Sequence, residues 1–347
     1  MRCKNCGQII ESWQKECPYC YATNDQYQEK VVEEANKDKN LVSNQTYVRY
    51  GNNQTQNDDV DGIRTADGFV NLHTKWWHHL LIAIGCYLGM QILATIILRV
   101  HITASAESYK CLATNAMCTI EDKNAAALAL ENASSVVQVV CELIFILTVM
   151  LIFSKHLKTF FSEAKEGKTW IGFGIGLGIM YGTSIVYNNI LNLLKLQSTS
   201  SNQDAVDSFI SSNLLFGFIF VVIAAPIFEE IVFRFGVFRA FQGSKKRQII
   251  GFIVTVILFA GIHMVATFTN VFADVNNPNW ELFKSDMLTF PVYIIGAVGL
   301  TFAYYKSKNL LSSILAHMTY NFLSFLAIIA YKFRDQIEEV IKLIFRI

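Results

Sequence analysis

Acidic, basic and imidazole side chains interrupt three apolar stretches of this chain, where a membrane-spanning segment normally carries none. Glu229, Glu230 and Arg234 lie in one stretch, His263 lies in the following one and His317 in the last. An ionised side chain near the centre of a bilayer costs about 3 kcal/mol on the insertion scale. Residues of these types on separate spans therefore predict a buried polar site that is shielded from lipid.

The two adjacent glutamates face different surroundings if their stretch is helical. Glu230 and Arg234 are four residues apart, so they share a face and can form an ion pair. Glu229 is rotated from them by about 100° and lacks that partner. An unpaired glutamate in a low-dielectric pocket suits a general base, although a structural ion pair with one spare, protonated glutamate is the alternative. Pro226 removes a backbone hydrogen bond just upstream, and we expect a kink there.

Two more pairs of residues share a helix face at a spacing of four, namely Phe259 with His263 and His317 with Asn321. A single histidine on an apolar face is more often a hydrogen-bonded core residue than a catalyst. Counting 1.5 Å per residue from the predicted loops, however, places Glu229, His263 and His317 about 12 to 21 Å deep. Side chains at these depths are compatible with one shared cavity.

The composition indicates a membrane protein. Of the 347 residues, 52% are hydrophobic and 16% are charged, whereas a soluble domain has about 25% charged residues. We expect an all-α polytopic membrane protein with seven transmembrane helices, or eight if residues 337–347 also cross. Each apolar segment has roughly the 20 residues that a crossing helix needs. The segments are 78–99, 135–153, 170–194, 213–237, 248–268, 288–305 and 310–331.

The third segment carries a repeated glycine pattern and a pair of asparagines. Gly174, Gly178 and Gly182 form a small-xxx-small pattern that favours close packing of one helix on another. Asn188 and Asn189 follow, and they either line the cavity or form a hydrogen bond between helices. The sequence leaves these two alternatives open.

Loop charges predict the orientation in the membrane. With a cytoplasmic N-terminus, the inner loops hold ten Lys or Arg residues and the outer loops four, as the positive-inside rule requires. Trp76 and Trp77 flank the first segment, and we expect the neighbouring His78 and His79 at the interface with them. The Asn-, Ile- and Lys-rich composition indicates a low-GC bacterium, so the expected location is the bacterial cell membrane.

The remaining cysteines and polar residues predict the organisation outside the membrane. Residues 1–22 look like a zinc ribbon, because two C-x2-C pairs supply four thiolates for tetrahedral coordination and so short a segment needs the metal to fold. Redox-active or disulfide-bonded cysteines are the alternative. A polar linker follows over 23–75, and the transmembrane domain spans 76–347. Cys111 and Cys118 lie in a predicted outer loop, where a disulfide can persist. The expected structural zinc ligands are Cys3, Cys6, Cys17 and Cys20.

The motifs E-E-x-x-x-R, F-x-x-x-H and H-x-x-x-N occur in this order within about residues 213–325. This set resembles the CPBP intramembrane proteases, which include the CAAX prenyl endopeptidases and bacterial proteins of bacteriocin processing and immunity. The predicted ribbon and linker are not part of the family core. The matching residues are Glu229, Glu230, Arg234, Phe259, His263, His317 and Asn321.

The resemblance implies a role for each motif residue. Glu229 and His263 would orient and deprotonate a water molecule that attacks a peptide carbonyl. His317 and Asn321 would stabilise the resulting oxyanion, which is typically worth about 3 kcal/mol per donor. Supporting residues would hold the helix geometry, and these are Glu230, Arg234 and Phe259.

A catalytic metal is left open by the sequence. The resembled family was long regarded as metal-dependent, and a glutamate mechanism without metal is now favoured for it. The H-E-x-x-H spacing is absent here. Glu229, His263 and His317 could form a His2Glu site only by converging within about 2 Å of one point. We therefore expect glutamate-type activation of water and no catalytic cofactor.

The expected function is an intramembrane endopeptidase acting on small peptides or membrane-anchored proteins in the lipid bilayer. A non-catalytic membrane scaffold or immunity protein is one alternative, in which the ribbon binds a protein partner. A proton or metal transporter is another, because intramembrane Glu and His residues also build ion pathways. The net charge of +1 gives no indication of a nucleic-acid partner.

Overall fold

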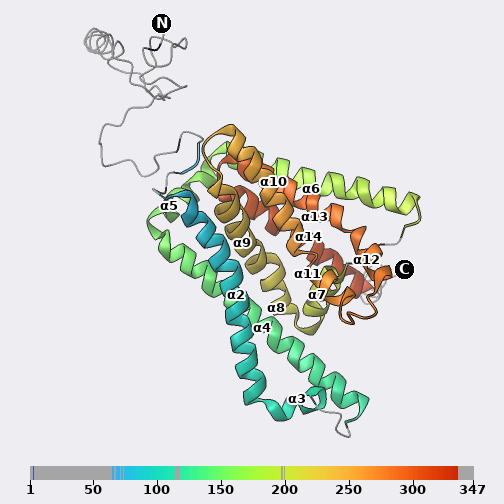
Figure 1. Ribbon diagram of the computed structural model, residues 1–347. Helices are drawn as coiled ribbons and strands as arrows, with labels where there is room; N and C mark the ends of the chain where they lie inside the picture. The colour runs from blue at the N-terminus through green and yellow to red at the C-terminus, as the bar shows by residue number, and fades with distance from the viewer. Residues whose placement is uncertain are drawn as a thin grey trace, which may run out of the picture. The chain divides into compact units, whose positions relative to one another are not determined.

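The computed structural model describes residues 3, 65, 68–70, 72, 74–113, 118–196, 198 and 200–334 (Figure 1). The chain divides into two units, residues 1–58 and 59–347. Cys3 is the described residue of the first unit, so the predicted zinc ribbon with Cys6, Cys17 and Cys20 lies outside the described residues. The same holds for most of the predicted linker and for residues 337–347.

The described part of the second unit is built from helices. Most of them follow one another through short turns, and α2 and α4 lie side by side with α3 connecting them at one end (Figure 1). The α-helices are α2 Trp76–Ala104, α3 Ala106–Ala113, α4 Ile120–Ile152, α5 Ser154–Ser162, α6 Gly167–Leu193, α7 Ser201–Ser212, α8 Leu214–Phe218, α9 Ala225–Glu230, α10 Lys245–Ile262, α11 Val265–Val271, α12 Trp280–Met287, α13 Phe290–Ser307 and α14 Leu310–Lys332. A 3-10 turn, η2, covers Glu163–Lys165, and two π-helical stretches are η3 Ile219–Ala224 and η4 Ile231–Phe238.

Polar caps explain where several of these helices begin. The side chains of Thr119, Ser200, Ser244 and Asn309 each accept a hydrogen bond from a backbone N–H in the first turn of α4, α7, α10 and α14. Such a cap satisfies a backbone donor that has no partner within the helix. The apolar runs that follow are therefore bounded by residues that the sequence itself supplies.

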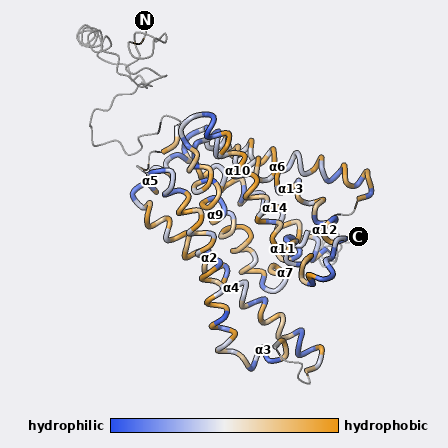
Figure 2. The backbone as a smooth tube through the Cα atoms, viewed as in Figure 1, coloured by the Kyte–Doolittle hydropathy of each residue, from blue (hydrophilic) through white to orange (hydrophobic). Residues whose placement is uncertain are grey.

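The expected membrane fold is confirmed. Six stretches in the described residues are long and apolar enough to cross a bilayer, and α10 with α11, bent by 42°, makes a seventh if the pair is one span. Hydrophobic residues cover most of these helices in Figure 2, and α2 exposes large apolar side chains such as Leu81, Leu88 and Ile92. Helices suit this setting because all their backbone polar groups are paired internally. The chain is an all-α integral membrane protein.

The fourth span is irregular around Pro226. The span runs from Leu214 to Phe238 and consists of α8, η3, α9 and η4 in succession. Pro226 lies at the start of α9 but inside the continuous helical span that η3 begins, where its missing N–H removes a backbone hydrogen bond. The irregularity expected at this proline takes the form of π-helical turns on both sides, a feature that is frequent at functional sites.

The prediction that Gly174, Gly178 and Gly182 pack closely against another helix is wrong. Among the described residues, nothing lies within 4 Å of a Cβ built at Gly174, Gly178 or Gly182. The close contact is made by another face of α6. A Cβ on Gly172 would lie 2.8 Å from the backbone oxygen of Ala303, and one on Gly176 would lie 2.8 Å from the Ala303 Cβ. Two faces of α6 carry glycines four residues apart, and the position of α13 selects the face that packs.

The residues just before the first span are part of the packed unit. Phe69, Val70 and Leu72 belong to the stretch predicted to be linker, yet all three are buried. Phe69 packs its ring 5.2 Å from that of Tyr304. The buried guanidinium of Arg239 donates to the carbonyl oxygen of Val70. These contacts attach the start of the membrane unit to η4 and α13.

His79 is buried, although it was expected at the membrane interface. Its Nδ1 lies 2.9 Å from the carbonyl oxygen of Phe235, and its Nε2 lies 2.9 Å from the Thr74 hydroxyl. A carbonyl oxygen only accepts, so Nδ1 carries the proton and Nε2 accepts from Thr74. Packing against η4 therefore outweighs the interfacial preference at this position.

The predicted disulfide between Cys111 and Cys118 is present.

Candidate active site

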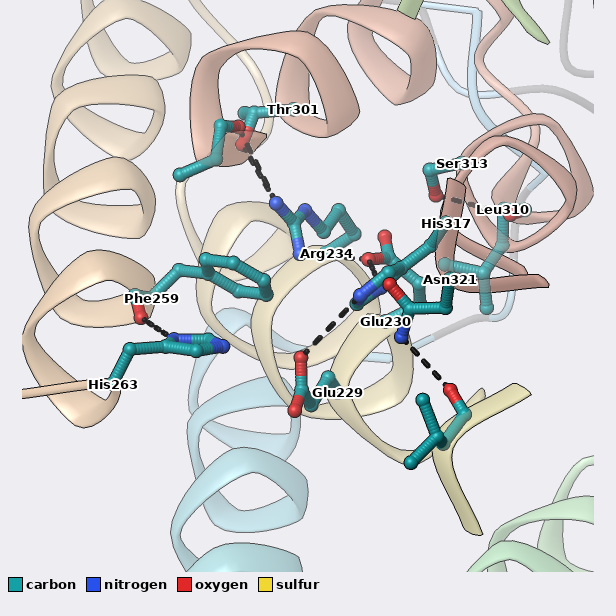
Figure 3. A network of polar contacts seen from close by, with 12 residues as sticks. Glu229, Glu230, Arg234, Phe259, His263, Thr301, Leu310, Ser313, His317 and Asn321 are labelled. Carbon is teal, nitrogen blue, oxygen red and sulfur yellow. Dashed lines mark hydrogen bonds and ion pairs between the residues drawn. The ribbon is translucent and has the colours of Figure 1, made fainter. Parts of the chain in front are cut away.

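The residues predicted to do chemistry line one cavity. It has a volume of about 560 Å³, and its wall includes Glu229 on α9, His263 at the end of α10, and His317 and Asn321 on α14. Helices α4, α6, α7 and α13 complete the wall. Figure 3 shows the rings of His263 and His317 directed toward the space beside Glu229. Three helices that are distant in sequence thus place these four side chains together.

Glu230 and Arg234 form the ion pair expected from their spacing. Arg234 Nη1 donates to Glu230 Oε1 at 2.8 Å, and both side chains are fully buried. Arg234 Nη2 also donates to the carbonyl oxygen of Ala297 at 3.3 Å. Because α9 and η4 carry one partner each and Ala297 belongs to α13, the pair joins the fourth span to its neighbour. The opposite charges compensate each other inside the unit.

Phe259 is the contact that connects the three motifs. The Arg234 guanidinium lies 4.3 Å from the centre of the Phe259 ring, a cation–π distance. The same ring lies 4.8 Å from that of His263 and 5.9 Å from that of His317. An aromatic ring at this position therefore sets the spacing between the arginine and both imidazoles, which an aliphatic residue would not do.

The tautomer of His263 follows from its hydrogen bond. Nδ1 lies 2.8 Å from the carbonyl oxygen of Phe259, one helical turn earlier. Since that oxygen only accepts, Nδ1 carries the proton, and in the neutral ring Nε2 keeps its lone pair. The ring also stacks on Tyr293 at a centroid distance of 4.7 Å. His263 therefore presents a positioned proton acceptor to the cavity.

His317 lies between the two glutamates. Its Nδ1 is 3.0 Å from Glu230 Oε1, and its Nε2 is 3.8 Å from Glu229 Oε2 (Figure 3). The first distance is a hydrogen bond and the second is too long for one. Glu229 Oε2 is buried without a hydrogen-bond partner among the described residues. One glutamate is therefore held by the histidine, while the other keeps a carboxylate oxygen available in the cavity.

Asn321 contacts the π-helical stretch before α9. Its Nδ2 donates to the carbonyl oxygen of Val221 at 2.8 Å, and Val221 lies in η3. An amide nitrogen has two hydrogens, so one N–H remains for another acceptor. The hydrogen bond also fixes the direction of the side chain toward the cavity that Val221 and Asn321 both line.

Comparison with known proteins was made on the whole chain. Residues 211–323 match the family model described as type II CAAX prenyl endopeptidase Rce1-like. The matched region contains all three motifs and four of the spans or their parts. This match supports the resemblance of residues 211–323 to the CPBP family. No curated protein and no solved structure matches the chain.

The match to this family model supports an intramembrane protease of the CAAX type. The family match covers the site from η3 to α14, which is the part that holds Glu229, His263, His317 and Asn321. Helices α4, α6 and most of α7 lie before the matched region and line the same cavity, which α13 inside the match also lines. The matched region therefore supplies the motif residues, and the preceding helices supply further lining residues.

The described side chains do not gather into a metal site. Within the described ranges, no three or more His, Cys, Asp and Glu residues are placed so that they could hold a metal ion.

Sequence reasoning missed a further acid in the cavity wall, Glu142 on α4. This residue is 3% exposed and lines the same cavity as Glu229. A carboxylate inside the second apolar segment was the available signal, on the same argument that singled out Glu229. Of the two asparagines left open, Asn188 lines the cavity, whereas Asn189 donates to the carbonyl oxygen of Ile185 at 2.9 Å.

Proposed function

We propose that this protein is an intramembrane endopeptidase that hydrolyses peptide bonds with water activated by Glu229 and His263. One observation carries the proposal. Glu229 has a carboxylate oxygen without a hydrogen-bond partner in the described structure, and two imidazole rings line the cavity wall around it. A free carboxylate beside oriented imidazoles is the arrangement that general-base catalysis requires.

In the first step, a water molecule binds between Glu229 and His263. The lone pair of His263 Nε2 accepts one hydrogen bond from the water, because Nδ1–H is directed to the Phe259 carbonyl oxygen. Glu229 accepts the other hydrogen and takes the proton as the water oxygen attacks the carbonyl carbon. A new C–O bond forms, and the carbonyl electrons move to the oxygen, which becomes an oxyanion.

The oxyanion needs hydrogen-bond donors in the same wall. Asn321 supplies the amide N–H that is not directed to Val221. His317 donates through Nε2 only when both ring nitrogens carry protons, because its Nδ1 is bonded to Glu230. Glu229 and Glu230 lie on either side of that ring, so an imidazolium has compensating charge there. This refines the neutral donor expected from the sequence.

Collapse of the intermediate completes the reaction. The proton held by Glu229 passes to the nitrogen of the leaving group, the C–N bond breaks, and the electron pair stays on that nitrogen as a free amine. The other product is a carboxylic acid, and Glu229 returns to its carboxylate form. Glu230 and Arg234 do not take part, because they neutralise each other and hold α9 and η4 against α13.

Small peptides and membrane-anchored proteins are the proposed substrates. The cavity is of the size of a ligand pocket and lies among membrane-spanning helices. A segment of peptide therefore reaches the site from within or beside the bilayer. This is proposed for a bacterial cell membrane with the N-terminus in the cytoplasm, as the loop charges favour.

Comparative peptidomics of cells that carry wild-type protein or Glu229→Gln tests the proposal. We expect a precursor peptide or protein to accumulate in the variant and its cleavage product to disappear. Glu121→Gln is the matched control, because Glu121 is exposed in the first turn of α4. Full biological activity of Glu229→Gln at normal abundance would contradict proteolysis and favour the non-catalytic scaffold.

A further inference from the structure

Glu142 is an acidic residue in the cavity wall that the proposed hydrolysis does not use. It lies on α4, whereas the motif residues lie on α9, η4, α10 and α14. The residue is 3% exposed. Its Oε1 accepts a weak hydrogen bond from Gln138 Nε2 at 3.4 Å, and its Oε2 has no hydrogen-bond partner among the described residues. A buried carboxylate with an unused oxygen is costly.

The charges around the cavity do not compensate this carboxylate. The lining residues include Glu142 and Glu229, and the described wall contains no Lys or Arg. Arg234 is occupied by Glu230. The imidazolium of His317 that the oxyanion step uses offsets the charge of Glu229. Glu142 therefore remains without a counter-charge in the described wall, which favours a positively charged group beside it and disfavours a further carboxylate.

Uncharged polar side chains surround the part of the cavity that α4, α6 and α7 form. They carry amide and hydroxyl oxygens that can accept hydrogen bonds from an ammonium or guanidinium group. Such a set, with one carboxylate among several neutral acceptors, fits the end of a lysine or arginine side chain. Its members are Gln138, Ser184, Asn188, Ser200, Asn202 and Gln203.

We propose that Glu142 is the acidic residue of a subsite that binds a basic side chain of the substrate, lysine or arginine, near the scissile bond. The inference rests on the proposed endopeptidase function and adds a substrate class to it. The cation of the substrate side chain supplies the counter-charge for Glu142. The neutral acceptors accept hydrogen bonds from the remaining N–H groups of that cation. A substrate with an acidic side chain or a free carboxylate at this position is rejected by the two glutamates.

The test measures binding separately from cleavage. Full-length Glu229→Gln protein in nanodiscs is titrated with fluorescein-labelled, acetylated and amidated heptapeptides that differ in the central residue: Lys, Gln, norleucine or Glu. We expect the Lys peptide to bind at least 10-fold more tightly than the Gln peptide. The double variant Glu142→Gln/Glu229→Gln should lose that preference, with the affinity for the Gln peptide unchanged.

Two matched variants separate charge from folding. Glu142→Asp keeps the charge and should keep the preference for Lys, and Glu121→Gln removes an exposed charge from the same helix and should change nothing. Equal binding of the Lys and Gln peptides by the Glu229→Gln protein would overturn the proposal. So would an equal loss of affinity for both peptides in Glu142→Gln, which would indicate a general role in the site.

Failure of the proposed function gives a different result. If wild-type protein and Glu229→Gln both leave the peptides intact, the proposed hydrolysis is wrong. The basic subsite is still tested in that case, because tighter binding of the Lys peptide and its loss in Glu142→Gln are measured by binding and not by cleavage. If wild type cleaves Lys and Gln peptides with equal kcat/KM and Glu229→Gln cleaves neither, hydrolysis stands and the basic subsite is wrong.

Discussion

Glu230 and Glu142 are both buried glutamates on membrane-spanning helices, but their surroundings are opposite. Glu230 Oε1 accepts from Arg234 at 2.8 Å and from His317 at 3.0 Å. Glu142 Oε1 has one weak contact with an amide, and Oε2 of both residues has no hydrogen-bond partner among the described residues. Glu230 has 0% exposure and Glu142 has 3%, so burial does not distinguish them. The partners do.

The difference shows how the same side chain serves structure in one region and recognition in another. A buried charge that is paired with an opposite charge and hydrogen bonds is tolerated and holds helices together. A buried charge without such a partner is tolerated where a cavity lets a ligand or solvent compensate it. Glu229 belongs to the second kind, because it forms no ion pair with an arginine in the described residues, whereas Glu230 pairs with Arg234.

The largest expected effect comes from disturbing the paired region. Glu230→Gln leaves the Arg234 charge buried without its partner, so the free energy of unfolding should fall by about 3–5 kcal/mol. Unfolding of the purified protein in mixed micelles, titrated with sodium dodecyl sulfate, measures this. A variant as stable as wild type would mean that the ion pair does not hold these helices.

Removing both charges should restore part of that loss. The double variant Glu230→Gln/Arg234→Met contains no unpaired buried charge and should be more stable than Glu230→Gln by about 2 kcal/mol. The same unfolding titration, arranged as a double-mutant cycle with Arg234→Met, gives the coupling energy between the two side chains. Additive effects would contradict a direct interaction.

Asp286 is a third buried acid, and hydroxyl and backbone donors contact it. It is fully buried, and its Oδ2 accepts from Thr267 Oγ1 at 2.8 Å and from the N–H and hydroxyl of Ser201. Asp286→Asn weakens these charge-assisted hydrogen bonds, so the unfolding free energy should fall by about 1–2 kcal/mol. A loss as large as that of Glu230→Gln would place Asp286 among the ion-paired acids.

The smallest expected effect on stability belongs to the unpaired region. Glu142→Gln keeps the shape of the side chain and removes a charge without a counter-ion, so the unfolding free energy should change by no more than about 1 kcal/mol. Thermal unfolding of wild type and variant side by side checks this. A destabilisation comparable with that of Glu230→Gln would show that Glu142 has a structural partner.

Much of this fold was predictable because its signals are local. The length of each apolar segment predicts a crossing helix, since backbone hydrogen bonds within a helix do not depend on distant residues. The pairing of Glu230 with Arg234 follows from a spacing of four on a single helix. The three motifs also predicted which spans meet, because their polar residues require a common shielded site.

Other features depend on which helices become neighbours. Gly172 and Gly178 both lie on α6, yet only the first has α13 atoms closer than 3.0 Å to a built Cβ. His79 stands beside two tryptophans at the start of α2, and contact with Phe235 buries it. Local periodicity and composition are the same whether or not such a residue is packed. The close packing of Gly172 and the burial of His79 could therefore not be predicted from the local sequence.

The amino-acid sequence alone was sufficient to identify the chemically active residue types, their helical spacing and the membrane-spanning segments, because each depends on residues that are close in the chain. The packing of distant helices determined that Glu142 faces the same cavity as Glu229 and that the Nδ1 atoms of His263 and His317 are engaged. Those properties arise from contacts between side chains far apart in sequence. Long-range packing chooses among faces that local periodicity leaves equivalent.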